Sequence, residues 1–158
     1  MKTFHKFIAT GFGSGYFPVA PGTAGAAVGV VLLWALHAFY FHYFTEPKGF
    51  LIVFVLIFLL FFWGGVWSTD HLEKEWGKDP SRVVMDEIIG LWLSMLFVPV
   101  TPLNLLLAFA LFRLFDIWKP LGIRQMERLK GGMGVMMDDV LAGLYANVCL
   151  QLILQLCF

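Results

Sequence analysis

The stretch FLIVFVLIFLLFFWGGVWS, residues 50–68, decides the fold. It carries no charged residue, and its length is close to the roughly 20 apolar residues that a helix needs to cross a membrane. Two further stretches, Ala24–Phe44 and Val140–Phe158, contain a few polar residues but no charged one. The sequence therefore predicts three long membrane helices.

Two shorter apolar runs lie between the second and third long stretches. They are Ile88–Val100 and Leu103–Trp118, joined at Thr101-Pro102. The first is short for a complete span, so the pair can form two short tilted helices or a re-entrant hairpin. We expect an all-α, polytopic integral membrane bundle with about three long spans plus two shorter membrane helices or a re-entrant hairpin. The whole chain, 1–158, is expected to form one membrane-embedded domain.

The composition supports this class of protein. Hydrophobic residues make up 59% of the chain and charged residues 14%, whereas soluble chains carry roughly 25% charged residues. The net charge is zero, so nothing favours nucleic-acid binding. The scattered histidines and the cysteines of the last apolar stretch form no zinc-binding pattern.

The basic residues indicate an orientation in the membrane. With the N-terminus in the cytoplasm, the inside segments are 1–23, 69–87 and 119–139, and they hold nine of the 11 basic residues. Arg113 lies near the same face, and only Lys48 falls on the outside. This bias agrees with the positive-inside rule. The acidic residues, apart from Glu46, gather on the same side.

A glycine-rich segment precedes the first long apolar stretch. The sequence GFGSGYFPVAPGTAG, residues 11–25, contains Ser14 and Thr23 among helix-breaking glycines and prolines. A loop of this kind before a helix can bring backbone N–H groups to an anion. The alternative is a flexible loop that folds over a helix end. It is not a Walker loop, because no Gly-Lys-Ser/Thr follows.

Two carboxylates open the first short run, in VVMDEIIG, residues 83–90. Asp86 and Glu87 stand directly before apolar residues. One interpretation is a helix start favoured by the macrodipole. However, an aspartate that dips to the middle of a membrane costs roughly 2.5–3.5 kcal/mol, and this cost favours a functional role.

The second short run ends in FRLFDIWKP, residues 112–120. Arg113, Asp116 and Lys119 are spaced three apart, so they lie along one side of a helix. An intrahelical Arg–Asp pair would explain two of them but not Lys119. Pro120 is expected to end the helix.

A second acidic pair precedes the last apolar stretch, in GGMGVMMDDVLAG, residues 131–143. Asp138 and Asp139 follow three glycines that loosen the backbone. One aspartate would serve as a helix cap, but a cap does not need two.

Together these clusters place five carboxylates and two basic side chains on one membrane face. The carboxylates are Asp86, Glu87, Asp116, Asp138 and Asp139, and the basic residues are Arg113 and Lys119. Gathered carboxylates repel each other, and a divalent cation removes the conflict. Mg²⁺ is the natural candidate, because it prefers oxygen ligands and is often held by carboxylates, waters and substrate phosphate. The pattern predicts metal-assisted chemistry on a lipid phosphate.

At these residues the sequence resembles the phosphatidylglycerophosphatase A family. The resemblance is carried by GFGSG…P…PGT-G at 11–25, DE-IG at 86–90, FR-FD-WKP at 112–120 and GG-G-M-DD--AG at 131–143. It implies a small helical enzyme of the bacterial inner membrane with its active site facing the cytoplasm. Such an enzyme hydrolyses phosphatidylglycerophosphate to phosphatidylglycerol and inorganic phosphate, with Mg²⁺, in phospholipid biosynthesis.

The resemblance also implies roles for residues of this chain. The five carboxylates are expected to bind one or two Mg²⁺ ions and to position an attacking water, or, for one of them, to act as general base. Arg113 and Lys119 would hold the phosphate, and Ser14 and Thr23 would close over the head group with the glycine loop. The expected partners are the phospholipid substrate and membrane lipids.

A different class of protein also fits some of these features. A small cation channel or transporter subunit could use carboxylates at the membrane boundary, such as Asp116, as an ion site. Against this alternative, the charges gather at one face, and Ala24–Phe44 and Phe50–Ser68 offer few polar groups for a pathway.

Overall fold

The computed structural model describes residues 2–78 and 80–157, and the regular elements in this part of the chain are all helices. They are α1 (Lys2–Ala9), the 3₁₀ turn η1 (Ser14–Tyr16), α2 (Pro21–Tyr43), α3 (Pro47–Trp76), α4 (Met85–Ser94), α5 (Pro102–Trp118), α6 (Ile123–Met126) and α7 (Gly132–Cys157). Three of them, α2, α3 and α7, are long and apolar enough to cross a membrane. The prediction of an all-α membrane bundle with three long spans is confirmed.

Proline and a hydroxyl cap set where the apolar helices begin. Pro21, Pro47 and Pro102 each stand in the first turn of a helix, where a missing N–H costs nothing. Thr101 also caps α5 by accepting a hydrogen bond from the backbone N–H of Asn104 at 3.2 Å. At its other end α5 stops at Lys119, which has left-handed backbone angles (φ 48°) directly before Pro120.

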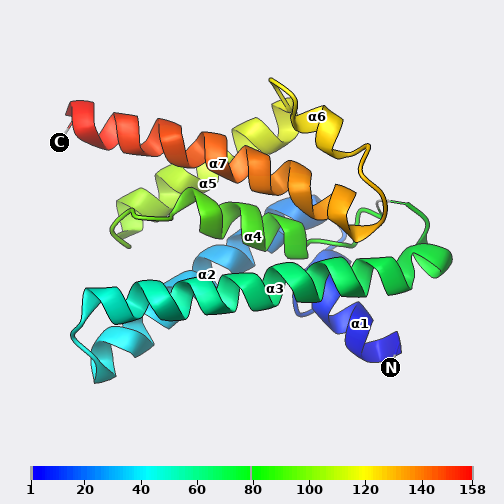
Figure 1. Ribbon diagram of the computed structural model, residues 1–158, viewed down its shortest axis with the longest axis horizontal. Helices are drawn as coiled ribbons and strands as arrows, with labels where there is room; N and C mark the ends of the chain where they lie inside the picture. Colours follow the sequence, from blue (N-terminus) through cyan, green and yellow to red (C-terminus); the bar gives the residue numbers. More distant parts are fainter. Residues whose placement is uncertain (1, 79, 158) are drawn as a thin grey trace.

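Helix α4 lies at the centre of the bundle, between α3 and α7 (Figure 1). Its 10 residues rise only about 15 Å, half of a hydrocarbon core of about 30 Å. The chain then turns, with Phe97 at a positive φ of 62°, and returns as α5. The α4–α5 pair therefore has the form of the hairpin that the sequence left open as one of two arrangements.

Glycines allow α4 and α7 to approach at backbone distance. A Cβ placed on Gly143 would lie 2.2 Å from the carbonyl oxygen of Gly90, and a Cβ on Gly90 would lie 2.7 Å from that of Asp139. Small residues at such crossings are a common way for membrane helices to pack closely. Asn147 adds polar contacts, since its Nδ2 donates to the carbonyl oxygens of Ser94 and Leu96 at 2.9 and 2.8 Å.

Two helices extend beyond the apolar stretches from which they were predicted. Helix α3 continues past Ser68 to Trp76, and α7 begins at Gly132 rather than at Val140. The end of α3 is joined to the start of α7, because the carboxylate of Asp70 accepts a hydrogen bond from the backbone N–H of Gly132 at 2.6 Å. Asp138 and Asp139 consequently lie inside a helix, beyond its first turn, and do not cap it.

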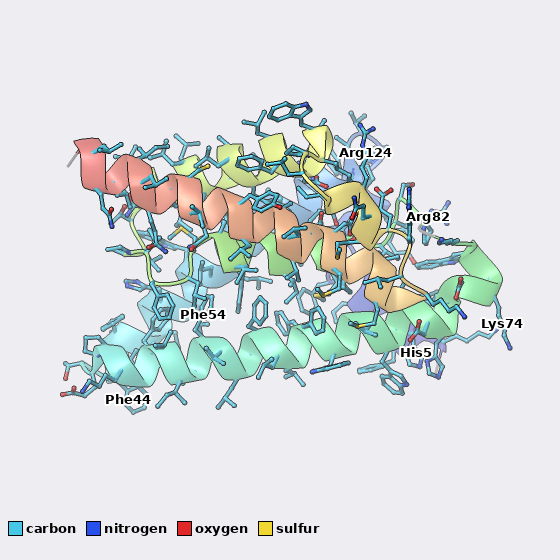
Figure 2. All side chains as sticks on the ribbon, turned by 45° about the horizontal axis from the view of Figure 1, so that its top comes forward. His5, Phe44, Phe54, Lys74, Arg82 and Arg124 are labelled. Atoms are coloured by element: carbon cyan, nitrogen blue, oxygen red, sulfur yellow. The ribbon has the colours of Figure 1, made fainter. Side chains whose placement is uncertain are left out.

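Charged and apolar side chains separate along the bundle. Figure 2 shows Lys74, Arg82 and Arg124 at one end, with Phe44 at the opposite end. The two chain termini also lie at opposite ends of the longest axis (Figure 1). This arrangement places the polar segments that contain the predicted site residues at one end of the three long helices.

Candidate active site

The α4–α7 crossing brings carboxylates from two distant parts of the chain together. Asp86 lies one helical turn before Gly90 on α4, and Asp139 lies one turn before Gly143 on α7. Residues one turn apart share a helix face, so the close contact of the glycines also holds the two aspartates near each other. Glu87 completes the group from α4.

Asp86, Glu87 and Asp139 form a site that could hold a metal ion. Each offers a carboxylate oxygen, and the three oxygens lie within 4.8 Å of one another. Ligands on opposite sides of one hard cation are separated by about 4–5 Å. Asp86 and Asp139 are buried, with 8% and 3% of their surface exposed. Oxygen-only ligands are typical of Mg²⁺, Ca²⁺ or Mn²⁺ sites.

The described protein groups do not satisfy all the oxygens of these three carboxylates. Oδ1 of Asp86 and Oε2 of Glu87 are buried and have no hydrogen-bond partner among the described residues. Burial raises the pKa of Asp86 well above its usual range, and the charge of Glu87 raises it further. Burial also raises the pKa of Glu87, although a hydrogen bond with Asp86 works in the opposite direction. A bound divalent cation would stabilise the ionised carboxylates and satisfy these oxygens.

Arg113 lies beside this group with its own carboxylate partner. Its Nη1 donates to Oδ2 of Asp116 at 2.5 Å and lies 4.0 Å from Oε1 of Glu87. The three side chains are largely buried, at 13–16% exposure. The Nε of Arg113 is buried without a hydrogen-bond partner in the part of the chain that the structure describes. A donor therefore remains for an anion.

Lys119 binds the other member of the α7 aspartate pair. Its Nζ donates to Oδ2 of Asp138 and to Oε1 of Glu127, both at 2.7 Å. Burial acts to lower the pKa of Lys119, but the hydrogen bonds with Asp138 and Glu127 outweigh it, and the pKa is raised. Lys119 therefore keeps its positive charge. Glu127 was not predicted from the sequence, where its only signal is its place in a segment on the same membrane face.

The glycine-rich segment packs against the site rather than standing apart from it. A Cβ on Gly22 would lie 2.2 Å from Oε1 of Glu87 and 3.1 Å from Nη1 of Arg113, so any larger residue here would displace these two side chains. Thr23 follows in the first turn of α2. The Ser14 hydroxyl donates within its own turn, to the carbonyl oxygens of Gly11 at 2.9 Å and Thr10 at 3.3 Å.

A charged cleft opens on the other side of Asp138. It has a volume of about 530 Å³, and basic side chains from two segments line it, namely Lys78 before α4 and Arg124 and Arg128 around α6. Glu127 and Asp138 also reach its wall. The polar end of the bundle thus combines buried carboxylates with a cationic entrance.

Sequence comparisons identify relatives over nearly the whole chain. The family model for phosphatidylglycerophosphatase A matches residues 7–154. A phosphatidylglycerophosphatase A of Escherichia coli is 35% identical over 86% of this chain and 75% of its own length. One of Haemophilus influenzae is 40% identical over 89% of this chain and 83% of its own length.

A third relative carries a different name. A putative phosphatidylinositol-3-phosphatase of Bacteroides thetaiotaomicron is 50% identical over 89% of this chain and 87% of its own length. No solved structure matches significantly. The names describe phosphatases that remove a phosphoric monoester, and the matched range includes all five predicted carboxylates. This chain is therefore a membrane phosphatase of phosphoric monoesters and belongs to the phosphatidylglycerophosphatase A family.

Proposed function

We propose that this protein hydrolyses the terminal phosphate of phosphatidylglycerophosphate, giving phosphatidylglycerol and inorganic phosphate, with Mg²⁺ as cofactor. The observation that carries the proposal is the position of the three-carboxylate group beside Arg113, at the polar end of membrane helices. The names of the E. coli and H. influenzae relatives support the same substrate.

Asp86, Glu87 and Asp139 would hold the cation, because their oxygens lie near enough to share one ion and two buried oxygens have no hydrogen-bond partner within residues 2–78 and 80–157. When bound, Mg²⁺ would polarise a phosphoryl oxygen and lower the pKa of a water molecule. The sequence prediction assigned metal binding to all five carboxylates. We propose that Asp116 and Asp138 contribute to the site mainly by holding their basic partners, Arg113 and Lys119, in place.

Arg113 and Lys119 would bind the phosphate and stabilise the charge that develops in the transition state. Arg113 has a buried Nε still able to donate, and Asp116 fixes the guanidinium in place. Lys119 is held between Asp138 and Glu127. One of the five carboxylates would accept the proton of the attacking water.

Thr23 and Ser14 would close over the head group together with the glycine loop. For Thr23, the support is its place directly after Gly22, which lies against Glu87 and Arg113. For Ser14, the support is the position of η1 next to α2. The hydroxyl of Ser14 is engaged within its own turn, so its part would be to shape the loop.

Phosphatidylinositol 3-phosphate is a second candidate substrate. It is favoured by the name of the B. thetaiotaomicron relative, which is 50% identical to this chain. Both lipids present a phosphate monoester on a polyol head group, so the same carboxylates and Arg113 would act on either. The comparisons give no support to the alternative of a cation channel or transporter subunit, since the three relatives described carry phosphatase names.

The protein is proposed to lie in a bacterial inner membrane with the site facing the cytoplasm. The support is the concentration of basic residues at the polar end of the bundle, seen for Lys74, Arg82 and Arg124 in Figure 2. Single cysteines introduced at Lys48 and at Lys74, in a chain with both native cysteines replaced by serine, test this orientation. An impermeant thiol reagent should label position 48 in intact spheroplasts and position 74 only after lysis.

Phosphate release from the purified protein tests the function. Mixed micelles would contain either phosphatidylglycerophosphate or phosphatidylinositol 3-phosphate, with Mg²⁺ or with EDTA. We expect rapid release from phosphatidylglycerophosphate with Mg²⁺ and none with EDTA. Full activity in EDTA would exclude the metal, and faster release from the inositol lipid would replace the proposed substrate by the second candidate.

A further inference from the structure

An apolar groove of about 570 Å³ runs between α2 and α5. Its α2 wall consists of Ala27, Val30, Val31 and Trp34. These positions follow the three- and four-residue spacing of a single helix face. Continued by one turn toward the start of α2, the same face arrives at Thr23, next to the glycine that lies against Glu87.

The α5 wall repeats this spacing in the opposite chain direction. It consists of Pro102, Leu105, Leu106 and Phe109. The same face of α5 continues from Phe109 to Arg113 one turn later, and then to Asp116. Both walls of the groove therefore lead into residues of the candidate active site.

The dimensions and exposure of the groove suit one leaflet of a membrane. From Asp116 to Pro102, α5 rises about 21 Å, while half of a hydrocarbon core is about 15 Å thick. The floor is formed by Leu105, which is only 4% exposed, whereas Val31 and Leu106 on the rims are each 65% exposed. The groove is thus open sideways toward lipid, and the helix faces that form its walls continue to Thr23 and Arg113 at the polar end.

We propose that this groove binds an acyl chain of the lipid substrate while Arg113 and the carboxylate group hold its phosphate. The inference rests on the proposed function and adds a second binding site to it. An amphiphile with an anionic head and an apolar tail matches a groove with a guanidinium at one end and no charged side chain along its walls. An acyl chain bound in the groove would orient the head group. The lipid would then lose less conformational entropy when its phosphate is positioned.

A second apolar groove serves as a comparison for the proposed acyl-chain site. It lies between α1 and α3, has a volume of about 660 Å³, and is lined by residues such as Phe4, Leu60 and Trp63. None of its lining residues is charged or lies on α2, α5 or α7. It faces lipid equally but leads to no member of the site, so it provides a matched control.

The test compares Leu106→Trp with Leu60→Trp. The two leucines are 65% and 69% exposed and line the first and second groove, respectively. The KM of the wild type and of both variants would be measured on phosphatidylglycerophosphate with short, medium and long acyl chains. Deacylated head group serves as a further substrate that does not need the groove.

In the wild type and in Leu60→Trp, KM should fall from the short to the medium acyl chains, because each methylene that moves from water into apolar contact improves affinity by about fourfold. In Leu106→Trp this dependence should flatten, with KM for the long-chain lipid raised about tenfold and activity on the deacylated or shortest substrate retained. Ala27→Phe, nearer the site, should give the same pattern.

Three results would overturn the proposal: a wild-type KM that is independent of chain length, the same dependence in Leu106→Trp as in the wild type, or equal flattening in Leu60→Trp. Failure of the proposed function has a different signature, because then the wild type would release no phosphate from any member of the series.

Discussion

Gly90 of α4 and Gly143 of α7 are in backbone contact, one helical turn beyond Asp86 and Asp139 on the same two helices. The distance between the helices therefore also sets the distance between the two carboxylates. The spacing of the two carboxylates thus depends on the absence of two methyl groups, and this dependence can be tested without altering any charged residue.

Gly143→Ala should separate α4 from α7, since its Cβ would lie 2.2 Å from the carbonyl oxygen of Gly90. Overpacking of this kind costs about 1–3 kcal/mol in stability, and the Mg²⁺ concentration for half-maximal activity should rise. Metal titration of phosphate release measures the effect. Gly64→Ala is the control, because its Cβ would meet only Ile8 at 3.8 Å. Equal Mg²⁺ requirements in both variants would contradict the idea.

Asp139→Asn should weaken Mg²⁺ binding by about 100-fold or more, because even partners of metal ligands contribute 10–100-fold to affinity. The buried position of Asp139 leaves the amide no access to solvent. Isothermal titration with Mg²⁺ and activity assays would both report the loss. Glu73→Gln removes an exposed acidic side chain from the polar end of α3 and should leave both measurements unchanged.

Arg113→Lys should lower kcat/KM by about 100-fold, in the range found when one donor to a developing charge is removed. Lysine lacks the planar fork that lets arginine bind Asp116 and an anion together. Steady-state kinetics on phosphatidylglycerophosphate would show the loss. Arg82→Lys, at an exposed position, should have wild-type kinetics. Retention of full activity by Arg113→Lys would make Arg113 a merely structural partner of Asp116.

Asn147→Leu should destabilise the fold by about 1–3 kcal/mol, because the carbonyl oxygens of Ser94 and Leu96 would lose the donor that satisfies them. Thermal unfolding in detergent, followed by circular dichroism, measures the change. Gln155→Leu replaces an exposed amide on the same helix and should have little effect. If both variants melt at the same temperature, the Asn147 hydrogen bonds are not important for stability.

The long apolar stretches could be predicted well because their signal is local. Phe50–Ser68 falls within α3, and Ala24–Phe44 falls within α2 except for its last residue, since hydropathy and length are enough to define a membrane helix. The second short run, predicted from Leu103 to Trp118, differs from α5 by one residue. Here Thr101-Pro102 and Pro120 gave unambiguous start and stop signals.

The start of α7 and the end of α4 could not be read from the same signals. Glycines at 131–134 suggested a loose backbone, yet Gly132 and Gly134 belong to the first turn of α7 and lie against the backbone of Val66 and Leu129. At Gly132 the small residue serves packing against Val66 of α3, which only the tertiary contact reveals, whereas Gly134 lies in the local turn that leads into α7. The run predicted to reach Val100 ends at Ser94, where Asn147 of another helix takes up the free carbonyls.

For the site, the sequence predicted that five carboxylates and two basic side chains gather on one membrane face, but it could not sort them into groups. The structure places Asp86 and Asp139 in one oxygen cluster, while Asp116 and Asp138 are paired with basic side chains. Which carboxylate pairs with which basic side chain depends on how each helix is rotated about its own axis. It also depends on the turn that brings Glu127 near Lys119. The three-residue spacing of Arg113 and Asp116 favoured their intrahelical pair, but no spacing in the chain encodes the contacts of Lys119 with Asp138 and Glu127.

Helix α4 has no residue on the outside of the bundle: each of its positions is buried or half-buried. Most of its apolar side chains are therefore shielded from the bilayer by protein, although their hydropathy is that of a membrane segment. Exposed apolar positions such as Leu60 on α3 can be substituted by other apolar residues as lipids differ between organisms. Each position of α4 is constrained by the protein side chains around it. We therefore expect α4 to accumulate substitutions more slowly than the other helices of the molecule.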